Sequence, residues 1–328
     1  MPIPTTCRIG YGLMNFTWTP RDIPDEQAFE AIKLAVDSGC TMLNSGEFYS
    51  REPIDDPCRN LRLLGRFFEK YPEYVDKTYV SVKGGQARGT MSPDASEENL
   101  RASVTTINKE LGGKKKMDLF EMARVDKNTS IEDTMKTLLK LRDEGHFKDI
   151  GLSECSAQTI RAAAKVAPIA GVEVEYSPWS LDIEHNGVLS TCKELGIPIA
   201  AYSPLGRGFL TGKLRSPDDI PEGDNRRRFD RFQPGNFEKN LAIVDKLGEM
   251  AKSKGVTPAE MILAWEIAQW EGIYPIPGST RPEGVKECMA ALQVKLSDEE
   301  VQEIREVVSK ADVVGGRYND HMAGQLEG

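Results

Sequence analysis

The sequence predicts an α/β protein built as one (β/α)8 TIM barrel, a single domain that spans residues 1–328. Eight short apolar segments alternate with segments of helical periodicity, and no shift in composition divides the chain. Eight such cycles are what a closed parallel barrel requires. We expect the strands at residues 9–12, 41–45, 78–83, 118–123, 149–153, 171–176, 198–202 and 274–278.

The segments between the strands carry apolar residues three and four positions apart, as one face of a helix does. This spacing predicts the first three helices around residues 29–36, 61–68 and 100–111. Ser130 followed by Asp133 predicts the start of the fourth helix, because a serine side chain caps the free N–H groups of a first turn. Gly145 predicts the end of that helix.

An open, doubly wound sheet is the alternative arrangement for the same alternation of strands and helices. Such a sheet usually carries a glycine-rich dinucleotide turn, and residues 10–15 do not complete the G-x-G-x-x-G pattern. Residues 208–213 resemble a phosphate-binding P-loop, but the segment is one residue too short and no Ser or Thr follows Lys213. A closed barrel is therefore the better prediction.

Three segments extend a minimal barrel. Residues 204–235 form a long connection with several prolines and glycines, which we expect at the catalytic mouth because it follows the seventh strand. Residues 257–269 predict a second helix before the eighth strand. Residues 297–310 predict an extra C-terminal helix that begins at Ser297, and a glycine-rich tail at residues 315–328 follows it.

The composition fits a soluble, cytoplasmic protein that acts on small molecules. Hydrophobic residues make up 39% and charged residues 28%, and the net charge of −9 disfavours binding to nucleic acids or acidic membranes. The first ten residues lack the pattern of a secretory signal, and no apolar run reaches the ~20 residues of a membrane span. The six cysteines and three histidines are scattered, which predicts reduced thiols and no metal site.

Tyr49 and Lys83 are the candidate catalytic pair, because each lies at the end of a predicted strand and should face the barrel mouth. An unperturbed phenol has a pKa of about 10 and is a weak acid near neutral pH. A cationic Lys83 beside Tyr49 would lower that pKa, which suits proton delivery to a carbonyl oxygen. Taken alone, two such residues are more often a half-buried aromatic side chain and a solvated lysine.

The last two strands end in groups that suit a nucleotide. Tyr202 could stack on a flat heteroaromatic ring while Ser203 faces a pyrophosphate, although a core tyrosine before a turn fits as well. Ser279, Thr280 and Arg281 precede a helix, and hydroxyls, a guanidinium and a helix N-terminus together favour a phosphate. An ordinary N-cap with a surface arginine is the alternative for that segment.

Several of these motifs, taken in order, resemble the aldo-keto reductase family over essentially the whole chain. They are residues 10–14, the segment that ends in Tyr49, the strand that ends in Lys83, and residues 117–126, 151–154, 173–177, 201–206 and 276–281. The resemblance implies a (β/α)8 barrel that binds NADPH across its mouth without a Rossmann domain. It also implies hydride transfer to an aldehyde or ketone, with a tyrosine as the proton donor.

Matched position by position, the resemblance implies that Tyr49 donates the proton and that Lys83 lowers its pKa. Ser153 and Glu173 fall where the family contacts the nicotinamide carboxamide, and Tyr202 where it stacks on the nicotinamide. The remaining implied cofactor contacts are Gly12 and Met14 after the first strand, Ser203, Leu205, Gly208 and Lys213 along the pyrophosphate, Ser279, Thr280 and Arg281 around the 2′-phosphate, and Glu287 near the adenine.

Four positions depart from the family pattern. Asn44 stands at the place of a catalytic aspartate and Ala123 at that of a histidine, while Glu173 replaces a glutamine and Cys288 an asparagine. Without an imidazole at position 123, no such group orients the substrate carbonyl, which predicts weaker or narrower catalysis.

The neutral amide of Asn44 cannot balance the charge of Lys83, so we expect more of the lysine's field to act on Tyr49. We keep Asn44 as the third candidate catalytic residue. Glu47 is a candidate to return a carboxylate to the pocket.

The segments NSGEFYS, LFEMARVD and GYGLMNFTW and the tail GGRYND are most similar to the pyridoxal reductase branch of the family. We therefore expect an NADPH-dependent reduction of pyridoxal to pyridoxine, or of other aromatic aldehydes or ketones, with a small-molecule carbonyl compound as the partner. A catalytically weak NADP-binding regulatory subunit is the second class. The missing histidine supports that class, whereas Tyr49 and Lys83 speak against it. The sequence leaves the oligomeric state open.

Overall fold

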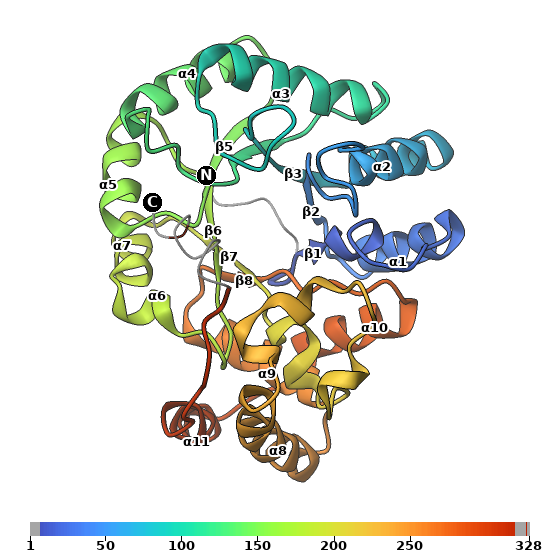
Figure 1. Cartoon of the computed structure of the whole chain (residues 1–328), viewed down its shortest axis with the longest axis vertical. Coiled ribbons are helices and arrows are strands. Elements are labelled where there is room, and N and C mark those ends of the chain that lie inside the picture. Colours follow the sequence, from blue (N-terminus) through green and yellow to red (C-terminus); the bar gives the residue numbers. More distant parts are fainter. Residues whose placement is uncertain (1–6, 319–325, 327–328) are drawn as a thin grey trace.

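The computed structural model describes residues 7–318 and residue 326, and it confirms the predicted barrel (Figure 1). Eight strands form one parallel sheet in the order of the sequence, so every strand pairs with the next one along the chain. The strands are β1 (Tyr11–Gly12), β2 (Met42–Gly46), β3 (Tyr79–Gly84), β4 (Leu119–Met122), β5 (Asp149–Ser153), β6 (Gly171–Glu175), β7 (Ile199–Tyr202) and β8 (Ile273–Pro275).

Backbone hydrogen bonds between the two ends of the sheet close the barrel. The N–H of Gly10 donates to the carbonyl oxygen of Pro275 at 2.9 Å, and that of Gly12 donates to Pro277 at 3.0 Å. The regular strands β1 and β8 are shorter than the predicted segments 9–12 and 274–278. Proline has no N–H to return to the ladder, so Pro275 and Pro277 limit the regular pairing at this junction.

The helices surround the strands, as Figure 1 shows. The first three predicted helices are present, and Ser130 caps the fourth by accepting a hydrogen bond from the N–H of Asp133 at 3.1 Å. The helices are α1 (Asp25–Asp37), α2 (Arg59–Lys70), α3 (Glu97–Glu110), α4 (Ile131–Asp143), α5 (Ala157–Val166), α6 (Asp182–His185), α7 (Val188–Leu195), α8 (Asn236–Lys254), α9 (Pro258–Gln269), α10 (Pro282–Ala290) and α11 (Asp298–Ser309).

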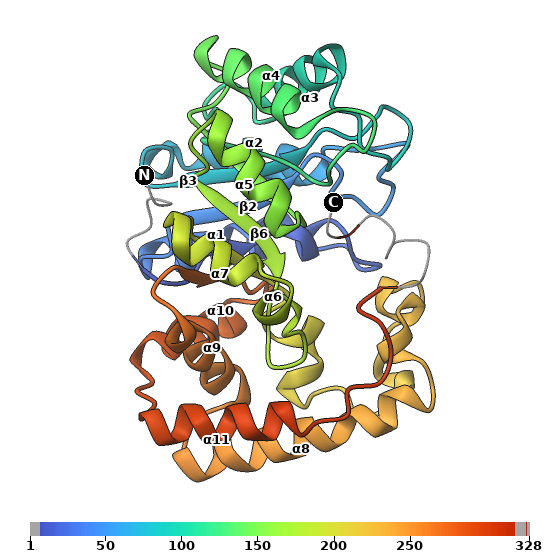
Figure 2. The same cartoon turned by 90° about the vertical axis from the view of Figure 1, so that its left-hand side faces the viewer.

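The predicted additions to the barrel are α9 and α11, which begin at capping boxes on Thr257 and Ser297. Figure 2 shows α11 lying along α8 at one end of the molecule. The long connection between β7 and α8 is folded into four short 3-10 helices. They are η3 (Gly206–Thr211), η4 (Pro217–Asp219), η5 (Asn225–Arg228) and η6 (Asp230–Phe232).

The chain after α11 returns to the barrel. The N–H of Val314 donates to Oδ1 of Asn240 at 2.9 Å, and Nε of Arg231 donates to the carbonyl oxygen of Gly315 at 3.1 Å. Only residues 315–318 and 326 of the predicted tail are described, so the last two positions of GGRYND lie outside the described residues. Within the described ranges, no helix has the length and apolar character needed to span a membrane.

Candidate active site

Four strands contribute to a buried polar cluster inside the barrel. Nζ of Lys83 on β3 donates to both carboxylate oxygens of Glu173 on β6, at 2.6 and 2.7 Å, and to Oδ1 of Asn44 on β2 at 2.9 Å. Nδ2 of Asn44 donates in turn to Glu173 at 2.6 Å. Only 5% of the Lys83 side chain and 3% of the Glu173 side chain are exposed. The alternative of a solvated Lys83 is therefore wrong.

This cluster corrects one expectation from the sequence. Asn44 does not neutralise Lys83, but Glu173 does, and its charge acts on the pKa of Tyr49 in the direction opposite to that of Lys83. The carboxylate oxygens of Glu173 thus accept hydrogen bonds from Lys83 and Asn44 in this structure. Its implied contact with a nicotinamide carboxamide stays a prediction.

Glu121 on β4 adds a second carboxyl group. In the sheet register Glu121 lies between Lys83 on β3 and Gly151 on β5. A Cβ atom at position 151 would lie 2.6 Å from Cγ of Glu121, so only glycine leaves room for this side chain. Burial and the neighbouring Glu173 carboxylate raise the pKa of Glu121. The pair therefore holds one negative charge more readily than two.

Tyr49 lies just after β2, on the segment that leads to α2. Its ring packs edge-on against Phe48, with 5.2 Å between ring centroids, and its backbone oxygen accepts a hydrogen bond from Oγ1 of Thr17 at 2.7 Å. A Cβ atom at position 46 would come within 2.9 Å of the Tyr49 ring, so Gly46 permits this close packing. The side chain is therefore held firmly in a nearly closed environment.

Lys83 and Tyr49 are brought together as the sequence predicts. Nζ of Lys83 lies 5.2 Å from the centroid of the Tyr49 ring. Burial raises the pKa of Tyr49 to about 12, although the charge of Lys83 and a side-chain hydrogen bond from it act in the lowering direction. The expectation of a lowered pKa is thus wrong for the net effect and correct for the contribution of Lys83.

The ammonium group of Lys83 stays protonated despite its burial. Burial alone would lower the pKa of Lys83, but the charges of Glu173, Tyr49 and Glu121 outweigh that effect and raise it. A permanent cation therefore lies beside the phenol and stabilises the phenolate that proton donation leaves behind.

Glu47 does not return a carboxylate to this cluster. Its Oε2 accepts a hydrogen bond from the hydroxyl of Ser103 on α3 at 2.5 Å, and its side chain lies behind Gly84. Burial raises the pKa of Glu47. The carboxyl groups at the site are Glu173 and Glu121 instead.

A second cluster at the end of β7 fixes the orientation of Tyr202. The Tyr202 hydroxyl donates to Oε1 of Glu154 at 2.7 Å and lies 3.0 Å from the hydroxyl of Tyr318. Arg207 stacks over the Tyr318 ring at 4.5 Å and pairs with Glu175 at 3.2 Å. Tyr202 is therefore anchored at its hydroxyl, which leaves its partly exposed ring as the surface available for stacking.

The segment after β7 contains non-glycine residues in the left-handed region of backbone conformation. Ser203 and Arg207 adopt left-handed φ values of 51° and 57°, which non-glycine residues rarely do. Successive N–H groups in such turns often point to one side and bind anions. Lys213, at the end of this segment, pairs with Glu287 on α10 at 3.4 Å, so two of the implied cofactor contacts lie together. Leu205 and Gly208 lie within the same turn.

The segment before α10 presents a free cation. Ser279 accepts a hydrogen bond from the N–H of Arg281 at 3.3 Å, and Thr280 accepts one from Nε2 of Gln27 at 2.5 Å. The guanidinium of Arg281 is exposed and makes no hydrogen bond or ion pair with any described residue. These groups, the turn after β7 and the anchored Tyr202 all lie at or after the ends of β7 and β8.

The other implied positions lie at the same end of the strands. Gly12 ends β1, Met14 follows it in a short 3-10 helix and is 40% exposed, and Ser153 is buried at the end of β5. Ala123 is buried after β4, and Cys288 is buried on α10.

Sequence reasoning gave no role to Glu121, Glu154, Arg207 or Tyr318. The sequence of β6 does contain a pattern that predicts a pair of carboxylates, because Glu173 and Glu175 alternate with valines in the segment GVEVE. Side chains two residues apart on a strand share one face, so this pattern places two carboxylates toward the same side. No local pattern marks Tyr318, because it reaches the site from the far end of the chain.

A closed (β/α)8 barrel with a buried tyrosine, lysine and carboxylate at the ends of its strands defines a barrel enzyme with an acid–base site. Comparison with protein families then places this chain. The model described as the aldo/keto reductase family matches residues 8–309, and the chain belongs to that family of oxidoreductases.

Curated relatives cover nearly the whole chain. Probable pyridoxal reductase 2 of Schizosaccharomyces pombe is 42% identical over 97% of this chain and 96% of its own length. Aldo-keto reductase yakc of the same yeast, whose name specifies NADP(+), is 40% identical over 96% of this chain and 92% of its own. Among solved structures, the glycerol dehydrogenase AKR11B4 of Gluconobacter oxydans covers 96% of this chain and 95% of its own with a TM-score of 0.82. At 22% identity, that likeness is one of fold.

Proposed function

We propose that this protein is an NADPH-dependent aldehyde reductase and that pyridoxal is its substrate. The observation that carries the proposal is the buried Tyr49–Lys83 pair with its counter-ion Glu173. The names of the relatives in Schizosaccharomyces pombe support the choice of pyridoxal and of NADPH over other aldehydes and NADH. Reduction of other aromatic aldehydes or ketones is the broader form of the same proposal.

The residues present would hold NADPH in three places. The partly exposed ring of Tyr202 offers a stacking surface, the turn at Ser203 offers N–H groups, and Arg281 offers a cation for a phosphate. When bound, NADPH supplies a hydride equivalent to the carbonyl carbon.

Tyr49 gives the phenolic proton to the carbonyl oxygen as negative charge develops there. With a pKa of about 12, Tyr49 carries its proton near neutral pH. Lys83 then stabilises the phenolate electrostatically, and Glu173 keeps the ammonium group in place. The burial of this cluster limits water around the proton that moves, which strengthens each of these interactions.

The decisive experiment follows NADPH absorbance with purified protein and a panel of pyridoxal, 4-nitrobenzaldehyde and a simple ketone. We expect the highest kcat/KM with pyridoxal. Turnover of 4-nitrobenzaldehyde without turnover of pyridoxal would support an aldehyde reductase but refute pyridoxal as its substrate. Tight NADPH binding without turnover of any carbonyl compound would favour the regulatory-subunit class, for which the absence of a histidine at position 123 is the supporting feature.

A further inference from the structure

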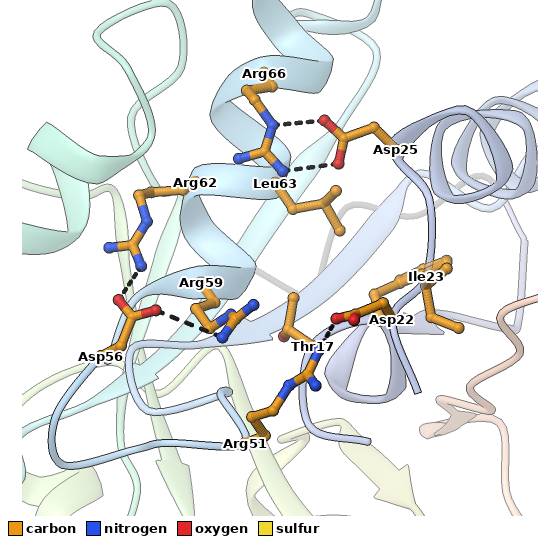
Figure 3. Close-up of a pocket in the computed structure, with 11 residues that line it drawn as sticks. Thr17, Asp22, Ile23, Asp25, Arg51, Asp56, Arg59, Arg62, Leu63 and Arg66 are labelled. Carbon is orange, nitrogen blue, oxygen red and sulfur yellow. Dashed lines mark hydrogen bonds and ion pairs between the residues drawn. The ribbon is translucent and has the colours of Figure 1, made fainter. Parts of the chain in front are cut away.

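A polar cavity lies outside the predicted catalytic and cofactor residues. It has a volume of about 350 Å³ and lies between α2, the chain before α1 and the segment after β2 (Figure 3). None of the residues that line it is among those expected to contact substrate or NADPH. The cavity is lined by Phe16, Thr17, Asp22, Ile23, Asp25, Arg51, Asp56, Arg59, Arg62, Leu63 and Arg66.

Four arginines and three aspartates line the cavity, and two carboxylates outside the lining, Glu52 and Glu110, also pair with its arginines. Three of the arginines lie on one face of α2, at positions 59, 62 and 66. Arg66 forms a two-point pair with Asp25 at 2.6 and 2.8 Å, and Arg62 pairs with Asp56 and with Glu110. These two guanidiniums are well matched by carboxylates.

The other two arginines are poorly matched. Arg59 lies 3.6 Å from Asp56 and 3.9 Å from Glu52, and its side chain is 32% exposed. Its guanidinium makes no hydrogen bond with any described residue. Arg51 pairs with Asp22, whose side chain is 85% exposed, and the buried Nε of Arg51 has no hydrogen-bond partner in the described part of the chain. Figure 3 shows Arg59 at the start of α2, with its ion pair to Asp56 drawn as a dashed line.

The position of Arg59 within its own helix is also electrostatically unfavourable. It is the first residue of α2, where the free N–H groups and the helix dipole favour an anion and not a cation. The preceding residue, Cys58, provides no side-chain cap for that helix end. The positive charge at this point has only two long ion pairs, with Asp56 and Glu52, and an anion in the cavity would add a closer partner.

We propose that this cavity binds a small phosphate monoester. A phosphate carries close to two negative charges and accepts paired hydrogen bonds from a guanidinium, which suits Arg59 and Arg51. An ion pair with a highly exposed partner contributes little to stability, so a phosphate can displace Asp22 from Arg51 at little cost. The volume exceeds that of a phosphate, and Phe16, Ile23 and Leu63 give the remaining wall an apolar surface for the organic part.

The cavity shares its wall with the segment that carries Tyr49. The N–H of Arg51 donates to the carbonyl oxygen of Thr17 at 3.0 Å, and the hydroxyl of Thr17 donates to the backbone carbonyl oxygen of Tyr49 at 2.7 Å. The bound ester would therefore lie behind the Tyr49 segment and not in the cluster that holds Lys83. Binding of an ester in this cavity does not depend on reductase activity.

Isothermal titration calorimetry with phenyl phosphate and with inorganic phosphate tests the proposal. The titrations are made in the presence of saturating NADP⁺, so that phosphate sites for the cofactor do not contribute. We expect phenyl phosphate to bind saturably and more tightly than inorganic phosphate. Arg59→Gln should weaken binding by about tenfold or more, because it removes a charge-assisted pair. Arg161→Gln is the matched control, since Arg161 on α5 forms an exposed pair with Glu194 elsewhere on the surface.

Arg51→Gln is the second variant and should weaken binding in the same way, which keeps the test decisive if Arg59→Gln folds poorly. Three results would overturn the proposal. They are the absence of saturable binding of phenyl phosphate, equal affinity for inorganic phosphate, and equal affinity in wild type and both cavity variants. Loss of affinity in Arg161→Gln to the same extent would also assign the binding to general surface charge.

Discussion

The two carboxylate oxygens of Glu173 lie 2.6 and 2.7 Å from Nζ of Lys83, inside the barrel. The counter-ion of the lysine therefore comes from β6, and the neutral Asn44 on β2 joins the pair by hydrogen bonds to both partners. A neutral residue at position 44 thus leaves a charge-balanced site. The electrostatics at Tyr49 depend on Glu173.

Glu173→Gln should lower the pKa of Tyr49. The Glu173 charge contributes to raising this pKa to about 12, and glutamine keeps the shape of the side chain without the charge. The pKa is measured by following the ultraviolet absorbance of tyrosinate against pH. Proteins that also carry Tyr49→Phe lack the Tyr49 signal and so identify it by difference. Breaking a buried ion pair costs about 3–5 kcal/mol, so circular dichroism should first confirm that the variant is folded.

Asn44→Asp serves as the counterpart of that variant, because it adds a carboxylate to the same cluster and should move the pKa of Tyr49 upward. Opposite shifts in the two variants would support the charge balance described here. Shifts of the same sign, or no shift in Glu173→Gln, would contradict it.

Tyr49→Phe should abolish most turnover while NADPH still binds. The variant removes the proton donor and leaves the aromatic packing against Phe48, and general acid catalysis contributes about 10²–10⁴-fold to a rate. We would measure NADPH oxidation with pyridoxal and, separately, NADPH binding by fluorescence. Tyr74→Phe is the control, because its hydroxyl bonds Asp37 away from the barrel interior. Equal turnover in wild type and Tyr49→Phe would remove Tyr49 from the mechanism.

Arg281→Ala should weaken NADPH much more than NADH. The Arg281 guanidinium is exposed at the start of α10, beside Ser279 and Thr280, and only NADPH offers it a 2′-phosphate. Loss of a charge-assisted hydrogen bond costs about 1.5–3 kcal/mol, or roughly a tenfold to hundredfold loss of affinity. Lys286→Ala removes a charge from the same helix and is the control. The same loss for both nucleotides would contradict the assignment of Arg281.

The order of elements followed from periodicity, since the alternation of apolar strands and helices is local information. The charge network did not follow in the same way. Asn44 and Glu173 are 129 positions apart, and only closure of the barrel brings them into contact. The wrong expectation for Glu47 has a local cause, because that side chain lies beyond the last strand residue, where alternation no longer fixes its direction.

The pKa of Tyr49 shows a second limit of sequence reasoning. The effect of Lys83 on the phenol could be predicted from the charge alone, whereas the larger effect of burial depends on how tightly the rings around Tyr49 pack. Family resemblance could supply the expected partners of Tyr49 but not that packing.

Glu266 on α9 offers a test of stability that is separate from the active site. It is fully buried, and neither carboxylate oxygen has a hydrogen-bond partner among the described residues. Burial raises its pKa well above the ordinary value, so the folded protein keeps Glu266 protonated at pH values where a free glutamate is ionised. The unfolded chain releases this proton above the ordinary pKa of about 4.3. The wild type therefore loses stability as the pH rises from there toward the pKa of the folded state.

Glu266→Met should stabilise the protein, and the gain should be larger at about pH 8 than at about pH 5. Methionine fills a similar volume and removes an unsatisfied buried carboxyl group, for which about 1–3 kcal/mol is typical. Urea unfolding at the two pH values measures the difference in free energy. Glu271→Met, at an exposed position just after the same helix, is the control and should change the pH dependence little. A gain that does not grow with pH would contradict this prediction, because it would mean that Glu266 is already charged in the folded protein.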